Sequence, residues 1–317
     1  MAGYSGDKIS LLVVAGPTAS GKTAAAIEAA RLLGGEIVSA DSMQIYRGLD
    51  IGTAKPTPPQ LAAVPHHMID IRDPQDAYSA ADYARDANAA IDGILSRGHV
   101  PIVCGGTGFY IEALVSGVEF AAQPDGGALR EQVRGDWEQR GTQAMLGELA
   151  GADPEYARTL HPNNVKRILR AVEKLRATGM TQAQLAEASH RAESRFRCHY
   201  AVLSPPRDTL YARIDARAGE MLRAGLLGEA RYVYDNRDRF ATARDAIGYK
   251  EFFGYFSGEQ TLEECADALR QASRRYAKRQ LTWFRRVRGA VWYEAADKMP
   301  QALAQELADG FRRIAER

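Results

Sequence analysis

One segment near the N-terminus has the residue types and spacing of a phosphate-binding loop: Gly16, Pro17, Thr18, Ala19, Ser20, Gly21, Lys22 and Thr23. It matches the pattern G-x-x-x-x-G-K-[ST], whose glycines let successive backbone N–H groups face an anion. Lys22 supplies a mobile positive charge, and Thr23 supplies a hydroxyl for a phosphate-bound Mg²⁺. An apolar run precedes the segment and a helical pattern follows it, which disfavours a chance match. The segment predicts a phosphate binder, but many chemistries share such a loop.

The elements around this loop predict an α/β fold built on a parallel sheet. Short apolar runs at 9–15, 36–40 and 100–104 are typical of buried strands, and helical spacing lies between them. Such alternation favours a doubly wound sheet. The pattern resumes with a strand at 198–203. The remaining expectations are a Pro-rich loop at 56–65, helices at 23–33, 78–97, 207–224, 226–233 and 261–288, and a last strand near 290–293.

The character of the sequence changes near Val118. From 127 to 197 it is polar and periodic with little strand signal, and Val165, Ile168, Leu169 and Val172 have helical spacing. We therefore predict a P-loop NTPase-like core made of 1–117 and 198–317, with a helical insertion domain at 118–197.

Two polar side chains follow predicted strands at the edge of the sheet where the phosphate loop lies. Asp41 ends the second strand, and Thr107 lies in the Gly-rich exit loop of the third. Ligands of open α/β sheets bind at this edge. Asp41 is interpreted as a base or a hydrogen-bond acceptor that faces the loop, or else as a turn or N-cap aspartate. Thr107 has a similar alternative, the closing of a turn.

A basic segment lies near the C-terminus. Arg270, Arg274 and Lys278 fall close to one helical face with Arg285, and no Asp or Glu occurs from 270 to 288. The full set is Arg270, Arg274, Arg275, Lys278, Arg279, Arg285, Arg286 and Arg288. So many cations favour a nucleic-acid surface, and the alternative is a solvated face balanced by acids elsewhere in the fold. The insertion carries a smaller cluster at 166–170.

The composition is that of an ordinary soluble protein. In 317 residues, 45% are hydrophobic and 26% charged, and the formal net charge of +1 indicates no partner. Cys104, Cys198 and Cys265 are odd in number and widely spaced, which fits a reducing compartment. Residues 1–10 resemble neither a signal nor a transit peptide, and no apolar run approaches the ~20 residues of a membrane span. We expect a cytoplasmic protein without membrane contact.

Taken together, the motifs resemble those of the bacterial tRNA dimethylallyltransferase family, also called the IPP transferase family. The matching segments are 16–23 (GPTASGKT), 39–46 (SADSMQIY), 64–70 (VPHHMID), 105–110 (GGTGFY), 161–173 (HPNNVKRILRAVE), 246–251 (AIGYKE) and 278–285 (KRQLTWFR). Phe109, where family members often have Leu, is a conservative difference. The resemblance implies transfer of a dimethylallyl group from dimethylallyl diphosphate to N6 of adenine 37 in tRNAs that read codons beginning with U.

The resemblance also implies roles for particular residues. The loop 16–23 would hold the diphosphate with Mg²⁺ at Thr23, and Asp41, Thr107 and Arg217 would act in catalysis. Contacts with the tRNA anticodon stem-loop would come from Asp41, Ser42, Met43, Gln44, Thr107, Arg130, Lys166, Arg167, Ile168, Leu169, Arg170, Gly248, Tyr249, Lys250, Lys278, Arg279, Gln280, Thr282, Trp283 and Arg285.

Other functions stay open on the residues alone. A small-molecule or nucleotide kinase explains the loop and the sheet but not the basic segments. A prenyltransferase for free adenine nucleotides makes those segments superfluous, and a non-catalytic RNA-binding protein leaves Lys22 and Asp41 unexplained. We expect a monomer.

Overall fold

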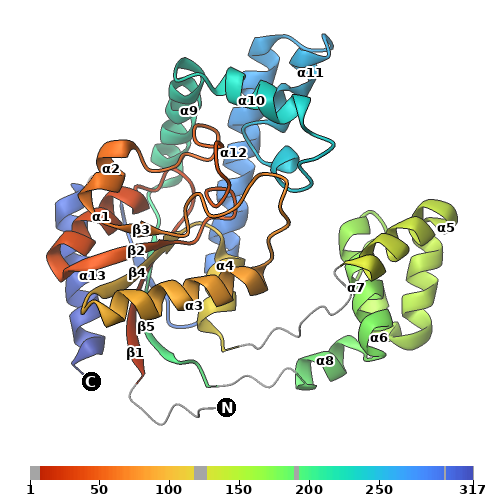
Figure 1. Cartoon of the computed structure of the whole chain (residues 1–317), viewed down its shortest axis with the longest axis horizontal. Coiled ribbons are helices and arrows are strands. Elements are labelled where there is room, and N and C mark those ends of the chain that lie inside the picture. Colours follow the sequence, from red (N-terminus) through yellow and green to blue (C-terminus); the bar gives the residue numbers. More distant parts are fainter. Residues whose placement is uncertain (1–7, 118–126, 189–192, 296–297, 317) are drawn as a thin grey trace. The chain divides into compact units, whose positions relative to one another are not determined.

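The computed structural model describes residues 8–117, 127–188, 193–295 and 298–316 (Figure 1). The chain divides into two compact units, Met1–Gly117 with Ser194–Arg317, and Val118–Glu193. We call the first the core unit and the second the insertion, and each is described by itself. The sequence predicts the same first residue for the insertion and an end at residue 197.

A parallel six-stranded sheet forms the middle of the core unit (Figure 1). Its strands are β1 (Ile9–Ala15), β2 (Gly35–Ser39), β3 (His66–His67), β4 (Val100–Gly105), β5 (Phe196–Leu203) and β6 (Val291–Tyr293). Their order is β3-β2-β4-β1-β5-β6, and every neighbouring pair is parallel. The predicted α/β class with a parallel sheet is confirmed.

Helices cover both faces of the sheet, so alternate residues of one strand enter different cores. Leu12 and Val14 pack with α1 and α13, whereas Leu11 and Val13 pack with α3 and α4. The helices of the core unit are α1 (Lys22–Leu33), α2 (Pro58–Ala63), α3 (Ala80–Ser96), α4 (Gly108–Val115), α9 (Arg207–Arg223), α10 (Leu226–Asp235), η1 (Ala243–Asp245), η2 (Lys250–Phe252), α11 (Phe253–Phe256), α12 (Leu262–Phe284) and α13 (Pro300–Ala315).

In the described residues, the insertion consists of helices around a small core of its own. They are α5 (Ala128–Ala152), α6 (Pro154–Arg158), α7 (Val165–Thr178) and α8 (Gln182–Ala188). Gly141, at φ 78°, interrupts α5. Ile168 and Val172, singled out by their spacing, are fully buried against Met145 and Leu149. Among the described helices of both units, none has the length and apolar character needed to cross a lipid bilayer.

The structure corrects two expectations about elements. The predicted Pro-rich loop contains α2, because Pro58 and Pro59 occupy the first turn, where a missing N–H costs nothing. A capping box between Thr57 and Gln60 fixes the start of this helix. The basic helix predicted to reach residue 288 ends at Phe284, with Arg285 as its C-cap.

A buried carboxylate of β2, Glu36, bonds to β3 and to the connection between α3 and β4. Glu36 is only 2% exposed and accepts two hydrogen bonds from Arg97, at 2.9 and 2.7 Å. His67 Nε2 lies 2.6 Å from Oε2 of Glu36, and His99 Nδ1 lies 2.6 Å from Oε1. The hydrogen bonds from Arg97 lead in lowering the pKa of Glu36 to about 2, against the opposing effect of burial.

We predict that Glu36→Gln destabilises the fold in a pH-dependent way. A carboxyl whose pKa is lower in the folded chain stabilises it above the unfolded pKa, and this contribution is lost as pH falls toward about 2. The free energy of unfolding should drop by about 2 kcal/mol at pH 7, and the difference from the wild type should shrink below about pH 4.5. Urea unfolding at several pH values measures both effects.

The matched control is Glu28→Gln, which removes an exposed ion pair with Arg31 on α1. It should change stability by less than about 0.5 kcal/mol. A pH-independent loss in Glu36→Gln would show that the charge of this carboxyl does not stabilise the fold.

Candidate active site

The phosphate loop joins β1 to α1, and glycines occupy two positions where a side chain would be strained or would clash. Gly21 is the N-cap of α1 with φ 87°, in the left-handed region. A Cβ at Gly16 would lie 2.7 Å from the carbonyl oxygen of Leu203 in the neighbouring strand. The Ser20 hydroxyl is buried and has no hydrogen-bond partner in the described structure. Buried hydroxyls are normally paired, so the Ser20 hydroxyl is available to donate a hydrogen bond to a ligand.

Two cations converge on this loop. Lys22 donates to the carbonyl of Pro17 at 3.2 Å, and it lies close enough to Arg217 of α9 for their charges to interact. Burial lowers the pKa of Lys22, and the charge of Arg217 acts in the same direction. Burial also lowers the pKa of Arg217. Neither side chain forms an ion pair within the described residues, so an anion placed between them would relieve their repulsion.

Asp41 and Thr107 lie together at the ends of β2 and β4. Oδ1 of Asp41 accepts from the backbone N–H of Met43 at 2.9 Å and that of Gln44 at 3.4 Å. Thr107 accepts from the N–H of Ser42 at 3.1 Å. Asp41 is thus a turn aspartate, as one alternative proposed, yet its Oδ2 makes no hydrogen bond in the described chain. Because Asp41 also interacts electrostatically with Lys22, the carboxylate faces the phosphate loop with one oxygen available.

Helix α12, near the C-terminal end of the sequence, also contributes side chains to the site. Gln280, only 6% exposed, accepts from the N–H of Thr18 at 2.9 Å and donates to the carbonyl of Gly106 at 2.9 Å. One side-chain amide therefore joins the phosphate loop to the exit loop of β4. Tyr276 lies near Thr107 and Asp41, and burial, followed by the charge of Asp41, raises its pKa to about 12.

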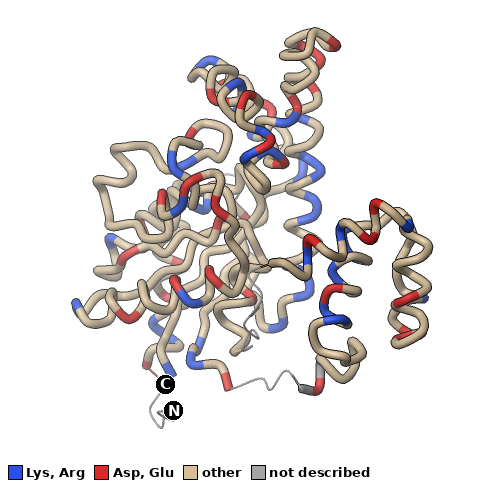
Figure 2. Tube along the Cα trace, turned by 45° about the vertical axis from the view of Figure 1, so that its right-hand side comes forward, with Lys and Arg blue, Asp and Glu red and all other residues tan. Residues whose placement is uncertain are grey.

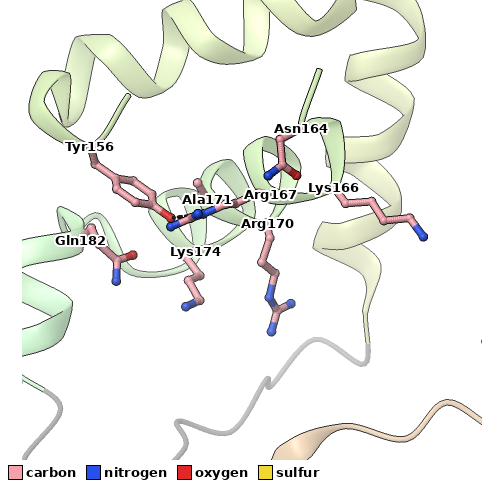
Figure 3. A pocket seen from close by; sticks show the side chains of 8 residues that line it. All are labelled: Tyr156, Asn164, Lys166, Arg167, Arg170, Ala171, Lys174 and Gln182. Atoms are coloured by element: carbon pink, nitrogen blue, oxygen red, sulfur yellow. Dashed lines mark hydrogen bonds between the residues drawn. The ribbon is translucent and has the colours of Figure 1, made fainter. Parts of the chain in front are cut away.

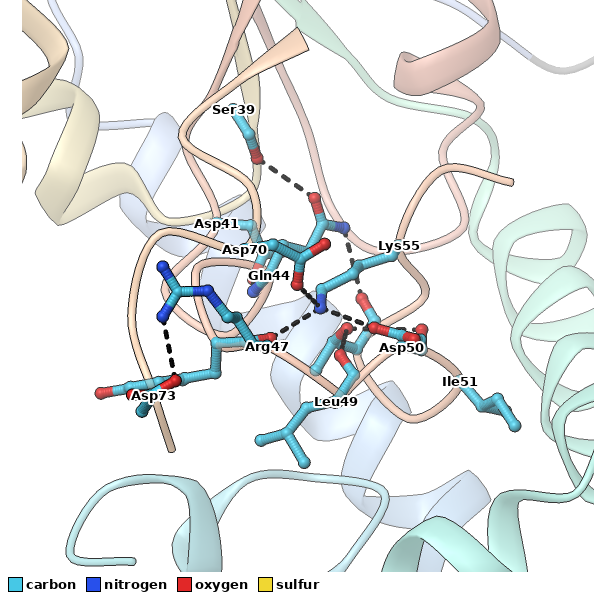
Figure 4. Close-up of polar contacts among 12 residues, drawn as sticks. Ser39, Asp41, Gln44, Arg47, Leu49, Asp50, Ile51, Lys55, Asp70 and Asp73 are labelled. Atoms are coloured by element: carbon cyan, nitrogen blue, oxygen red, sulfur yellow. Dashed lines mark hydrogen bonds and ion pairs between the residues drawn. The ribbon is translucent and has the colours of Figure 1, made fainter. Parts of the chain in front are cut away.

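The segment after Asp41 is held by partly buried and exposed polar contacts, drawn in Figure 4. Gln44 accepts from the Ser39 hydroxyl and donates to the carbonyls of Thr53 and Ala54, at 3.1 to 3.3 Å. Lys55, whose side chain is 5% exposed, donates to the carbonyl of Tyr46 at 2.6 Å. It also pairs with Asp50 and Asp70. The amide of Gln44 is therefore committed to the protein, and its predicted contact with RNA stays a prediction.

Residues 50–52 of this segment bond to a carboxylate of α10. Glu229 accepts from the backbone N–H groups of Asp50, Ile51 and Gly52 at 2.7 to 2.9 Å. It also accepts from the hydroxyl of Tyr249 at 2.7 Å. A Cβ at Gly52 would lie 2.4 Å from the Tyr249 ring, so the loop fits closely on this side chain. Gly248 and Tyr249 are themselves buried, and Lys250 beside them is exposed.

The basic segment presents exposed charge at the end of α12 and beyond it (Figure 2). Two of its eight cations are paired, Arg274 with Asp215 at 2.8 Å and Arg270 with Asp267. The six others are exposed and form no ion pair with any described residue: Arg275, Lys278, Arg279, Arg285, Arg286 and Arg288. The alternative that acidic residues elsewhere in the fold balance this basic segment therefore holds for only two of its eight cations. Thr282 is exposed on the same helix.

The basic cluster of the insertion lines a pocket of about 390 Å³ (Figure 3). Its walls are formed by Tyr156, Asn164, Lys166, Arg167, Arg170, Ala171, Lys174 and Gln182. Arg167 lies over the Tyr156 ring at 5.9 Å, and Arg170 pairs with Glu173 at 2.6 Å. Ile168 and Leu169 instead pack in the core of the insertion. Their side chains are used at least partly for packing, and their predicted contact with RNA stays a prediction.

The structure brings the phosphate loop, Asp41, Thr107 and Arg217 together in the core unit. Arg130 lies on α5 and its guanidinium is within 3.5 Å of Glu173. Sequence patterns miss Tyr276, Glu229 and Lys55. The partners of Tyr276 and Glu229 are distant along the chain, whereas Lys55 bonds to the nearby Tyr46, Asp50 and Asp70 without any recognisable motif. Gly52 and Gly106 are the only hints in the sequence, because a glycine often marks a place where another group packs closely against the backbone. Here the Tyr249 ring packs against Gly52 and the Gln280 side chain against Gly106.

Comparisons with known proteins identify the family of this chain. The family described as IPP transferase matches residues 44–287. A tRNA dimethylallyltransferase of Anaeromyxobacter sp. (strain K) is 48% identical over 282 residues, which cover 89% of this chain and 92% of the relative. One of Bacillus subtilis (strain 168) is 42% identical, over 93% of this chain and 94% of the relative.

Solved structures give the same result. A tRNA isopentenylpyrophosphate transferase of Bacillus halodurans superposes with a TM-score of 0.72 at 37% identity, and 98% of this chain and 99% of that one are covered. A eukaryotic dimethylallyltransferase acting on tRNA superposes with a TM-score of 0.79 at 27% identity, over 92% of this chain and 75% of that one. With a family match over most of its length and relatives above 40% identity, the chain belongs to the IPP transferase family.

Proposed function

We propose that this enzyme transfers the dimethylallyl group of dimethylallyl diphosphate to N6 of adenine 37 in tRNAs that read codons beginning with U. The products are N6-dimethylallyladenosine and diphosphate. We propose further that it acts in the cytoplasm as a monomer. Relatives across bacteria carry the name tRNA dimethylallyltransferase, which supports both the donor and the acceptor.

One observation carries the proposal. Lys22 and Arg217 converge on a loop of backbone N–H groups without a paired carboxylate, while Asp41 faces the same loop with a free oxygen. The cations suit a leaving group that becomes more negative as its bond breaks. The carboxylate suits a nucleophile that must lose a proton. A prenyl transfer from a diphosphate to an amine needs both at once.

Asp41 is the proposed general base. The lone pair of the adenine N6 is delocalised into the ring, so the amine is a poor nucleophile until a base accepts its hydrogen bond. Oδ1 of Asp41 is held by the N–H groups of Met43 and Gln44, which fixes the carboxylate and leaves Oδ2 to take the proton. Thr107, fixed by the N–H of Ser42, lies beside it and would orient the amine.

The diphosphate is the proposed leaving group. Negative charge builds on its bridging oxygen as the allylic C–O bond breaks, and the allyl fragment spreads the positive charge. Lys22, Arg217 and the N–H groups at the start of α1 would stabilise the departing oxygen. The unpaired Ser20 hydroxyl adds a donor that is already buried beside this position.

The residues present fit a Mg²⁺ that is held largely by the substrate. Among the described residues, no group of three or more His, Cys, Asp or Glu side chains could hold a metal. The half-buried Thr23 hydroxyl makes no hydrogen bond with any of them. Mg²⁺ commonly takes few protein ligands and several phosphate oxygens. With Thr23 and the diphosphate as ligands, it would neutralise charge on the leaving group.

The acceptor is proposed to be held by the basic surfaces. The six unpaired cations from 275 to 288 suit the phosphates of an anticodon loop. Lys166, Arg167 and Arg170 of the insertion offer a second set of contacts. The target base must leave its stack to reach Asp41, and an unpaired loop lowers that cost. A nucleotide kinase would need neither surface.

A direct assay tests the function. Purified protein incubated with dimethylallyl diphosphate, Mg²⁺ and tRNA should yield N6-dimethylallyladenosine, which mass spectrometry of the digested nucleosides identifies. Modification of free AMP without tRNA would favour the nucleotide prenyltransferase, and phosphoryl transfer from ATP would favour the kinase. Either result, without modified tRNA, would overturn the proposal.

We predict that Asp41→Asn lowers the single-turnover rate about 10²- to 10⁴-fold, the usual contribution of a general base. The amide can still accept from the N–H groups of Met43 and Gln44, so donor and tRNA binding should change little. Rapid-quench kinetics and equilibrium binding separate the two effects. Asp73→Asn, which removes an exposed partner of Arg47, is the control and should be normal. A wild-type rate in Asp41→Asn would exclude the general-base role.

We predict that the double charge reversal Lys278→Glu and Arg279→Glu weakens tRNA binding and lowers its dependence on salt. Loss of two phosphate contacts should reduce the slope of log K against log [salt] by about 1 to 2. The control with the same charge change is Arg31→Glu with Arg312→Glu, on α1 and α13. If both double variants keep the wild-type slope, α12 does not contact the RNA backbone.

A further inference from the structure

Phe109 is an exposed aromatic side chain at the rim of the site. It is the second residue of α4 and lies two positions after Thr107, yet 53% of it is open to solvent. We propose that Phe109 is a stacking platform for the unpaired base next to the target adenosine. The inference rests on the proposed function, because it assigns part of the acceptor RNA to this side chain.

The ring is held in place by α12. Phe109 and Trp283 meet edge to face, with ring centroids 6.1 Å apart and planes at 79°. Trp283 is itself fixed, because its ring occupies the space above Gly108, where a Cβ would lie 2.1 Å from it. A ring with few free rotamers loses little entropy when a base stacks on it, and edge-to-face contact leaves much of the ring surface of Phe109 available.

The positive charge near the Phe109 ring favours an anionic binding partner. Thr282 and the unpaired cations Lys278, Arg279 and Arg285 lie on the same end of α12 as Trp283. Such a surface repels a basic partner and attracts an anionic one. A nucleotide in a single strand combines a phosphate for the cations with an aromatic face for the ring. Phe109 lies two residues after Thr107, which is proposed to orient the reacting amine, so the base on Phe109 would be a neighbour of that adenosine.

The test is a double-mutant cycle that combines a protein variant with RNA variants. Phe109→Leu keeps an apolar side chain but removes the aromatic face. Because Phe109 is exposed, the variant should fold normally, which thermal unfolding checks. The probes are three anticodon stem-loops, one intact and two with an abasic nucleotide immediately 5′ or 3′ of the target adenosine. Binding of each RNA is measured by anisotropy with the full-length wild type and with Phe109→Leu.

We expect Phe109→Leu to bind the intact RNA about tenfold more weakly, within the range of base–aromatic stacking, and with an unchanged salt slope. With one of the two abasic RNAs, the wild type and the variant should bind alike, because the stacked base is already missing. Phe109→Trp should restore tight binding. The control is Tyr232→Leu, which removes a 48% exposed ring in edge-to-face contact with Phe240 on another surface and should change nothing.

Two outcomes would overturn the inference. Equal affinities of the wild type and Phe109→Leu for the intact RNA would show that the ring contributes nothing. An equal loss with all three RNAs would show that it acts through something other than a neighbouring base. If the wild type fails to modify tRNA at all, the proposed function itself fails, and the nucleoside assay detects that separately.

Discussion

The meeting of Lys22 and Arg217 is the constraint on which the rest of the site depends. Two cations placed close together and partly withdrawn from water repel each other, and the lowered pKa of each reflects the cost of keeping it charged there. No side chain among the described residues forms an ion pair with either. The fold therefore maintains an unfavourable arrangement that an anionic substrate turns into a favourable one.

Such an arrangement persists only on a rigid support. The parallel sheet supplies it, because β1, β2 and β4 carry the phosphate loop, Asp41 and Thr107 at one edge, with helices packed on both faces. Gln280 then fixes the distance between two of these loops by bonding to Thr18 and to Gly106. A looser connection would let the phosphate loop, which carries Lys22, shift relative to the exit loop of β4, which carries Thr107.

What could be predicted from the sequence follows from how local each signal is. The phosphate loop and the strands at 9–15 and 100–104 are local patterns, and they are found where expected. The prolines of the helix at Pro58 predict a loop unless the capping residues Thr57 and Gln60 are considered. Glu229 bonds to N–H groups about 180 residues away, at Asp50 to Gly52, and no periodicity indicates such a partner.

The segment after Asp41 is ordered before any RNA binds. Lys55 and Glu229 bond to the stretch from Tyr46 to Gly52. The Gln44 amide also donates within this segment, to the carbonyls of Thr53 and Ala54. The conformational entropy of this loop is therefore lost during folding and not again when RNA binds. Because the loop is already ordered, a base that enters the site meets a carboxylate whose position is fixed. Discrimination between bases then depends on shape and on contacts such as the exposed ring of Phe109, since the loop itself has little freedom to adapt.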